Sequence, residues 1–171
     1  MSRDFDVTAL PPSDHPEVGE TAPDFTRPLV TDEFWENVPL SALTDEGPVV
    51  LVFYPMDGSP TAVNLWSELR KRDWQGTHDV ALVGVSVSNP YEHKAFIDEQ
   101  GLDARLFSDP TNEIATAYDV VYDTDGMAGI TEGRPAVFVL DTDRTVTYAW
   151  TTEEWPAYPE YDAVERAIER L

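Results

Sequence analysis

The stretch Val49–Tyr54, with the sequence V-V-L-V-F-Y, and the segment P-M-D-G-S-P at residues 55–60 decide the fold. The first stretch is continuously apolar and consists of β-branched, leucine and aromatic residues, which is typical of a strand covered on both faces of its sheet. In the second, Ser59 is a helix-capping type and Pro60 favours the first helical position. The sequence therefore predicts a central strand, a short loop and a helix that ends near Arg72.

Similar patterns continue along the chain. They predict strands at 80–87, 106–108, 136–140 and 145–150, and helices at 89–100, 112–118 and 161–171. Strand and helix alternate at first, which favours parallel strands, whereas the turn at residues 141–144 predicts an antiparallel pair. The order fits an α/β thioredoxin-like fold, with a central mixed β-sheet flanked by helices. The pattern alone leaves a flavodoxin-like sheet open.

The chain divides into an N-terminal extension and one domain. Residues 1–18 contain Pro11, Pro12 and Pro16 and show no apolar periodicity, which predicts an extended or partly disordered arm. The domain is expected over residues 19–171.

Composition excludes several classes of function. The 171 residues include 33 acidic and 11 basic ones, for a net charge of −22, which disfavours nucleic acid and anionic membranes as partners. Scattered carboxylates with nine arginines and only two lysines are typical of proteins that work in molar salt, such as those of a halophilic archaeon. The start of the chain has no secretory signal and no apolar run is long enough to span a membrane, so we expect a cytoplasmic protein.

Five segments together carry a family resemblance. They are G-E-T-A-P-D-F at 19–25, F-Y-P-M-D-G-S-P at 53–60, V-S-V-S at 85–88, L-F-S-D-P at 106–110 and V-F-V-L-D at 137–141. In this order they resemble peroxiredoxins of the alkyl hydroperoxide reductase/thiol-specific antioxidant (redoxin) family, over about residues 19–150. The resemblance implies a thioredoxin-like fold and, for an intact member, thiol-dependent reduction of hydroperoxides.

The active-site signature of that family is Pro, three residues, Thr or Ser, two residues, Cys. It matches Pro55 and Ser59, but the position of the peroxidatic cysteine is Ala62, and the chain has 0 cysteines. Ser59 cannot replace the thiol, because peroxide reduction needs an atom that forms and releases a sulfenate, which oxygen does not do. We therefore expect no peroxidase activity from this chain.

A second departure concerns the arginine that stabilises the thiolate in the family. Its position is Pro135, with Arg134 one residue earlier. A proline here resembles the cis-proline of thioredoxins, so we predict a cis Arg134–Pro135 bond, with Pro135 packed near Ala62 against the start of the helix at residues 60–72. Arg134 is equally consistent with a pocket residue and with a surface residue.

Three functional hypotheses follow. The first is a non-catalytic binding or structural module; the second is a thiol peroxidase whose cysteine was replaced by Ala62; the third is an enzyme of another class. The third would bind a small anion through Tyr54, Ser59, Thr61 and Arg134 at the start of the helix. We expect an unidentified protein or small-ligand partner and leave a homodimer open.

Cofactor and metal sites are not expected. The 3 histidines, His15, His78 and His93, lack the spacing of metal ligands, and the last two are expected near solvated ends of elements. The acidic stretch Asp123–Glu132 matches a calcium loop only in part. Trp150 and Trp155 fit either a partner surface or an edge strand covered by the C-terminal segment.

Overall fold

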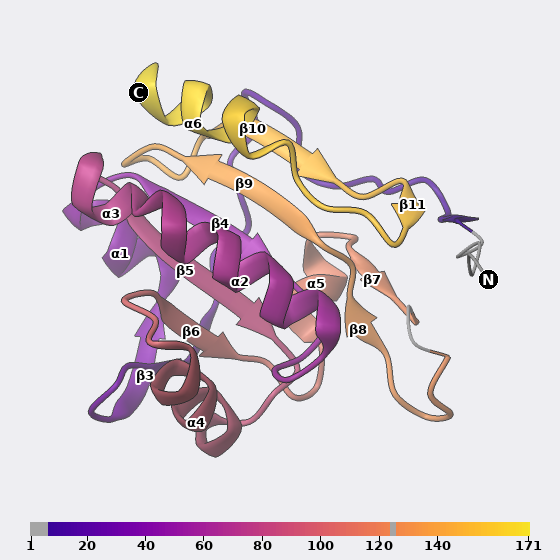
Figure 1. Ribbon diagram of the computed structural model, residues 1–171. Helices are drawn as coiled ribbons and strands as arrows, with labels where there is room; N and C mark the ends of the chain where they lie inside the picture. Colours follow the sequence, from indigo (N-terminus) through magenta and orange to yellow (C-terminus); the bar gives the residue numbers. More distant parts are fainter. Residues whose placement is uncertain (1–6, 124–125) are drawn as a thin grey trace.

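The computed structural model describes residues 7–123 and 126–171, and its centre is a seven-stranded mixed sheet (Figure 1). The strand order is β10-β9-β4-β5-β6-β2-β3. The strands are β2 (Thr26–Val30), β3 (Trp35–Pro39), β4 (Val49–Phe53), β5 (Ala81–Ser86), β6 (Arg105–Ser108), β9 (Ala136–Leu140) and β10 (Val146–Thr151). Strands β4, β5 and β6 are parallel, and β9 pairs antiparallel with β4 and β10. This is the thioredoxin-like fold that the sequence predicts.

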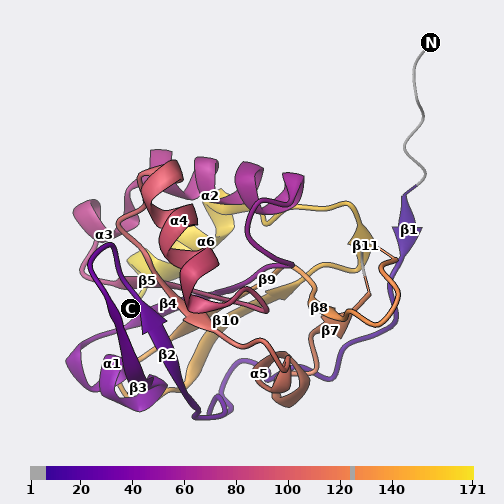
Figure 2. The same cartoon turned by 90° about the horizontal axis from the view of Figure 1, so that it is seen from below.

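Helices cover both faces of the sheet. The helices are α1 (Leu40–Glu46), α2 (Pro60–Arg72), α3 (Trp74–Thr77), α4 (Pro90–Gln100), α5 (Glu113–Ala117) and α6 (Tyr161–Glu169). Figure 2 shows α2, α4 and α6 on one face and α1 and α5 on the other. No helix in the described part of the chain is long and apolar enough to cross a membrane.

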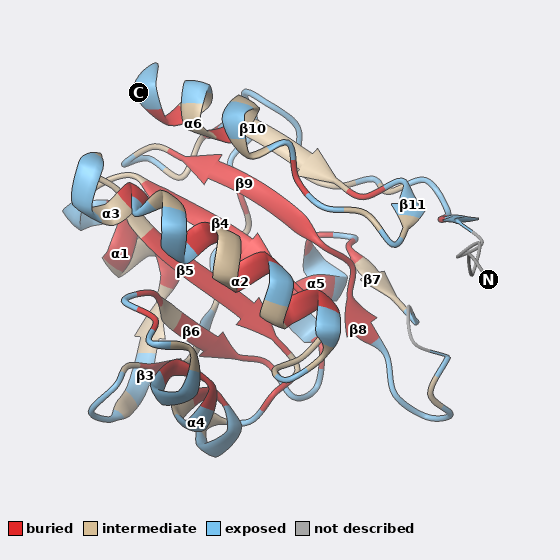
Figure 3. Ribbon diagram, viewed as in Figure 1, coloured by how far each residue is buried: buried red, intermediate tan, exposed pale blue. Residues whose placement is uncertain are grey.

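The alternating residues of β4 explain why its pattern is continuously apolar. Val50, Val52 and Tyr54 pack with α2, α4 and α6, whereas Leu51 and Phe53 pack with α1 and α5. Figure 3 shows the resulting buried centre at β4, β5 and β9. The carboxyl end of β4 therefore emerges from the middle of the core and delivers the following loop to the start of α2.

Gly84 in β5 allows the closest packing between α2 and the sheet. A Cβ atom at this position would lie 2.6 Å from Cζ2 of Trp66 and 2.6 Å from Cδ2 of Leu106. Trp66 is fully buried and its ring lies edge-on to Tyr54, with 5.5 Å between the centroids. The absence of a side chain at Gly84 thus lets the indole lie directly over the strand.

The first segment of the domain forms elements that the sequence does not predict. β2 and β3 make an antiparallel hairpin that joins the far edge of the sheet through β6. The described residues also form two short strand pairs, β1 (Thr8–Ala9) with β11 (Glu154–Trp155) and β7 (Val121–Tyr122) with β8 (Glu132–Gly133), and an isolated bridge between Thr21 and Thr145. Residues 7–18 lie against the domain on the side of α5 (Figure 2).

The prediction of a cis Arg134–Pro135 bond is wrong. The cis bond among the described residues is Trp155–Pro156, and Arg134–Pro135 is trans. The physical reason is that the chain does not turn there: the Arg134 amide donates to the Val120 carbonyl at 2.7 Å, and the Pro135 carbonyl accepts from Thr152 at 3.0 Å. An extended connection leads straight from β8 into β9, and the pairing of β9 with β4 does not depend on a cis bond.

Candidate functional site

The loop at residues 55–59 lies between the carboxyl end of β4 and the start of α2. Pro55 is buried and Ser59 is half-buried. The Ser59 hydroxyl accepts a hydrogen bond from the Ala62 amide at 3.2 Å and donates to the Met56 carbonyl at 2.8 Å. Ser59 is thus the N-cap of α2, as its residue type predicts, and it also closes the loop on itself.

Ala62 lies in the first turn of α2 and is fully buried. It belongs to the same apolar cluster as Tyr54, Leu65 and Val137. Its methyl group therefore occupies the position where the family signature places sulfur, and that position is part of the core.

A buried network of hydrogen bonds holds the loop at residues 55–59 in place. The Tyr54 hydroxyl donates to Oδ1 of Asp57 at 2.6 Å, and Nδ1 of His93 in α4 lies 2.6 Å from the other carboxylate oxygen. Nε2 of His93 lies 3.0 Å from the Phe107 carbonyl, and the Ser88 hydroxyl accepts the Asp57 amide at 2.9 Å. The loop is thereby tied to α4, to the end of β6 and to the loop after β5.

The network satisfies the polar atoms of both buried side chains. Both ring nitrogens of His93 have partners, the Asp57 carboxylate and the Phe107 carbonyl. The His93 side chain is 0% exposed and that of Asp57 is 6% exposed. Burial, together with the adjacent Asp57 carboxylate, raises the pKa of Tyr54 well above its ordinary value, so this hydroxyl keeps its proton.

The expectation that His93 is a solvated histidine at a helix end is therefore wrong. His93 shares the buried face of α4 with Phe96 and Ile97, three and four residues later. That spacing is the signal in the sequence that places it inward. Its bond to Asp57 joins residues 36 positions apart, which no local pattern shows.

Arg134 is directed toward the N-terminal arm. It is 4% exposed, and its Nη1 donates to the Pro11 carbonyl at 2.8 Å and to the Thr152 carbonyl at 3.4 Å. Its guanidinium lies over the Tyr122 ring at 5.7 Å. Burial lowers the pKa of Arg134 below its ordinary value, although Asp119 and Tyr122 act in the opposite direction. Arg134 is thus neither a surface residue nor bonded to the loop at 55–59.

Because Arg134 bonds the arm directly, Arg134→Met is expected to loosen residues 7–18 while leaving the sheet folded. A hydrogen bond from a charged donor is worth about 1.5–3 kcal/mol, so the Leu10 amide, which donates to the Glu153 carbonyl, should exchange with solvent roughly tenfold faster or more. Hydrogen exchange measured by NMR or mass spectrometry checks this. Arg166→Met, on the exposed side of α6, is the control and should leave the rate unchanged. Equal rates in all three proteins would contradict the role of Arg134.

The structure does not bring the four residues of the anion hypothesis to one ligand. The Tyr54 hydroxyl is bonded to Asp57, Ser59 to the start of α2, and Arg134 to the arm. Thr61 is buried in the first turn of α2. Pro135 lies at the same end of the sheet as this turn, because the next residue, Ala136, pairs with Phe53. Its contact with Ala62 stays a prediction.

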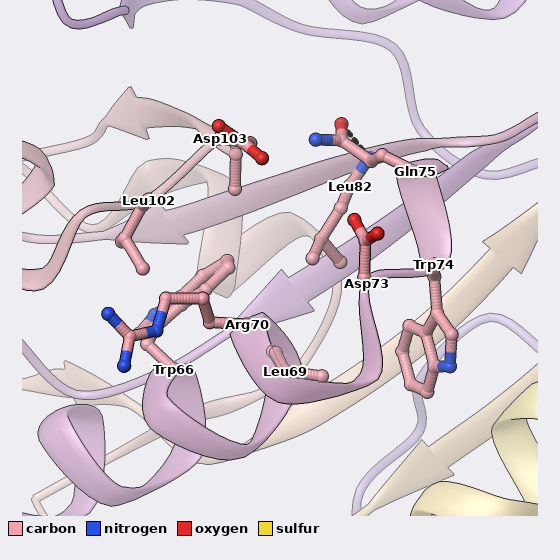
Figure 4. A pocket seen from close by; sticks show the side chains of 10 residues that line it. Trp66, Leu69, Arg70, Asp73, Trp74, Gln75, Leu82, Leu102 and Asp103 are labelled. Carbon is pink, nitrogen blue, oxygen red and sulfur yellow. Dashed lines mark hydrogen bonds between the residues drawn. The ribbon is translucent and has the colours of Figure 1, made fainter. Parts of the chain in front are cut away.

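Two cavities lie at opposite ends of α2. The first, about 30 Å³, is at the end of α2, where Leu69, Leu82 and Leu102 form part of its wall together with Trp66 and Arg70 (Figure 4). This volume holds about one water molecule. The second, about 370 Å³, lies beside the loop at 55–59 and is lined by Met56, Val87, Ser88, Glu92, Pro110, Thr111, Asn112, Gly129, Ile130 and Thr131. It lies at the carboxyl ends of β5 and β6, where α/β folds commonly bind ligands.

The remaining sequence-predicted features have no common site. Trp150 and Trp155 are half-buried, in β10 and β11, and β11 pairs with the arm. No group of three or more His, Cys, Asp or Glu side chains in residues 7–123 and 126–171 is placed to hold a metal. Asp125, one residue of the partial calcium loop, lies outside the described residues.

Comparisons with known proteins agree with this geometry. Residues 18–149 match the AhpC/TSA family. The chain is 32% identical over 142 residues to the chloroplastic 2-cysteine peroxiredoxin of Chattonella marina var. antiqua. The aligned region covers 77% of this chain and 69% of that protein. The crystal structure of peroxidoxin BcpB from Mycobacterium tuberculosis is 25% identical, with a TM-score of 0.73 over 91% of this chain and 96% of that one. The 2-Cys peroxiredoxin of Plasmodium vivax, also 25% identical, has a TM-score of 0.75 over 89% and 80%. The chain therefore belongs to the AhpC/TSA family of peroxiredoxins, and because it contains no cysteine it lacks the peroxidatic thiol.

Proposed function

We propose that this protein is a non-catalytic binding module, in which the loop at residues 55–59 and the cavity beside it bind a protein partner or a small ligand in the cytoplasm. The observation that carries the proposal is the contrast between a lost reactive atom and a retained scaffold. The methyl group of Ala62 replaces the sulfur, whereas the loop next to it is held by Asp57, His93 and Ser88.

The environment of Ala62 supports the absence of catalysis independently of the missing thiol. A nearby cation, together with the N-terminus of a helix, favours the thiolate of a reactive cysteine. Arg134 instead bonds the arm, and the side chain of Ala62 lies among apolar residues. The site thus differs from that of a peroxidase in its missing sulfur, in the direction of Arg134 and in the apolar surroundings of residue 62. Restoring the sulfur does not change the other two features.

The buried network supports a binding role. Buried polar groups are costly to remove from water, and they hold their places only when their hydrogen bonds are satisfied. Here both carboxylate oxygens of Asp57 and both ring nitrogens of His93 have partners. The network gives the loop one fixed shape beside a cavity of about 370 Å³, which is what recognition of a partner requires.

The test is hydroperoxide consumption in molar salt with dithiothreitol as reductant, comparing the unaltered chain with Ala62→Cys. The unaltered chain should show no turnover above that of the reductant alone. A cysteine at position 62 would lie in the first turn of α2, where the helix dipole lowers the pKa of a thiol, but it would be fully buried, and burial raises that pKa; Arg134, which bonds the arm, does not stabilise a thiolate there. We therefore expect Ala62→Cys to gain no more activity than an exposed thiol does.

Ala117→Cys, on the exposed side of α5, is the matched control for an ordinary thiol. Turnover by the unaltered chain would overturn the proposal. Rapid turnover by Ala62→Cys, far above Ala117→Cys, would also overturn it and would favour a peroxidase whose cysteine has been replaced. Equal, slow rates for the two variants support a non-catalytic module.

A further inference from the structure

Methionine supplies all the sulfur of this chain. The 3 methionines are Met1, Met56 and Met127, and of these Met56 belongs to the loop at residues 55–59. Its side chain lines the cavity of about 370 Å³ next to that loop and is half-buried. A thioether is thus placed in an open cavity, whereas the position of the former thiol is closed.

Hydroxyl groups line the same cavity as this sulfur. The Ser88 hydroxyl accepts the Asp57 amide at 2.9 Å, and the Thr131 hydroxyl accepts Nδ2 of Asn112 at 3.0 Å. A serine or threonine hydroxyl has one hydrogen to donate besides its acceptor sites. Both residues can therefore offer a hydrogen-bond donor to an oxygen atom bound in the cavity.

We propose that Met56 is a modification site, at which a small peroxide that enters this cavity oxidises the thioether to the sulfoxide. A lone pair of the sulfur attacks the outer oxygen of the peroxide, the S–O bond forms and the O–O bond breaks. The sulfur loses two electrons, and the peroxide is reduced to water or an alcohol. The proton of the attacked oxygen moves to the departing oxygen through a hydroxyl or water in the cavity.

This modification goes beyond the proposed binding function and differs from peroxidase activity. Each chain consumes one equivalent at Met56, and a sulfoxide is returned to methionine by dedicated reductases, not by simple thiols. The oxidation replaces an apolar wall of the cavity with a polar group. The two proposals fail in different experiments. The modification is tested by the oxygen atom added at Met56, whereas the non-catalytic function is contradicted by turnover of hydroperoxide.

The experiment is a time course with hydrogen peroxide, analysed by peptide mass spectrometry for the added oxygen at Met56 and Met127. Met127 is half-buried like Met56 but does not line the cavity, so it controls for access. The ratio of the Met56 rate to the Met127 rate is also measured in the unfolded chain, which corrects for the intrinsic reactivity of the two residues. We expect Met56 to react about tenfold faster than Met127 in the folded chain, the factor that one hydrogen bond made in the transition state supplies.

Thr131→Val tests the role of the cavity, because it removes a hydroxyl from an exposed position at nearly constant volume. It should lower the rate at Met56 and leave the rate at Met127 unchanged. Met56→Leu should abolish the added oxygen in that peptide. Equal rates at Met56 and Met127 in the folded chain, or an unchanged Met56 rate in Thr131→Val, would overturn the proposal.

Discussion

Asp57→Ala is expected to lower the free energy of unfolding by about 2–5 kcal/mol, because it leaves Nδ1 of His93 and the Tyr54 hydroxyl buried without their partner, and each unsatisfied buried polar group costs about 1–3 kcal/mol. The Asp57 side chain is 6% exposed and His93 is 0% exposed, so water cannot replace the lost carboxylate. The Tyr54 hydroxyl loses its acceptor at the same time. This loss is a large part of the about 5–15 kcal/mol that stabilises an ordinary domain. Urea unfolding at constant high salt measures it.

The matched control is Asp98→Ala, which removes the exposed ion pair with Lys94 on the same helix. The two side chains of that pair are 58% and 34% exposed, and such pairs contribute about 0.3–0.5 kcal/mol. Asp57→Asn keeps the shape but not the charge, and should lie between the two. A loss of less than about 1 kcal/mol in Asp57→Ala would show that the pair does not hold the loop.

The parts of the fold that local patterns specify are predicted well. The strand at β4, the N-cap at Ser59 and the helix bounds of α2 and α4 follow from apolar runs, capping residues and prolines. These signals lie within a few residues of the feature that they specify. The antiparallel pairing of β9 and β10 likewise follows from a short turn.

The hairpin of β2 and β3 is missed because its pattern is that of an exposed edge. Glu36 and Asn37 face solvent, and Pro28 argues against a strand that is paired on both sides. In the structure, β6 pairs with Leu29 and Val30, just beyond this proline. The proline therefore lies where the strand has only one neighbour, which the sequence alone does not show.

The candidate site is predicted only where it is local. The family motif identifies Pro55, Ser59 and Ala62, but the direction of the Arg134 side chain depends on the arm, more than a hundred residues away in the chain. The partnership of His93 with Asp57 likewise depends on the packing of α4 beside β4. Contacts between distant segments arise from the whole fold, and a single sequence carries no signal for them.

The second large effect expected is a loss of most of the stability when salt is lowered from several molar to about 0.1 M, where the Debye length rises from about 3 Å or less to about 10 Å. The net charge of −22 then becomes a long-range self-repulsion that compaction increases. Thermal unfolding at a series of NaCl concentrations measures it. The same series with sucrose at low salt is the control, since sucrose favours burial but does not screen charge.

A variant at the end of one helix distinguishes the screening of charge repulsion by salt from the other effects of salt. Helix α1 ends in Asp45 and Glu46, with no basic residue in its last turn, so two exposed negative charges lie at the negative end of the helix dipole. Each such contact costs about 0.3–1 kcal/mol at low ionic strength and is screened by salt. The double variant Asp45→Asn, Glu46→Gln should therefore be more stable than the unaltered chain at low salt and equal to it at high salt. An equal gain at both salt concentrations would show that charge repulsion is not what salt relieves.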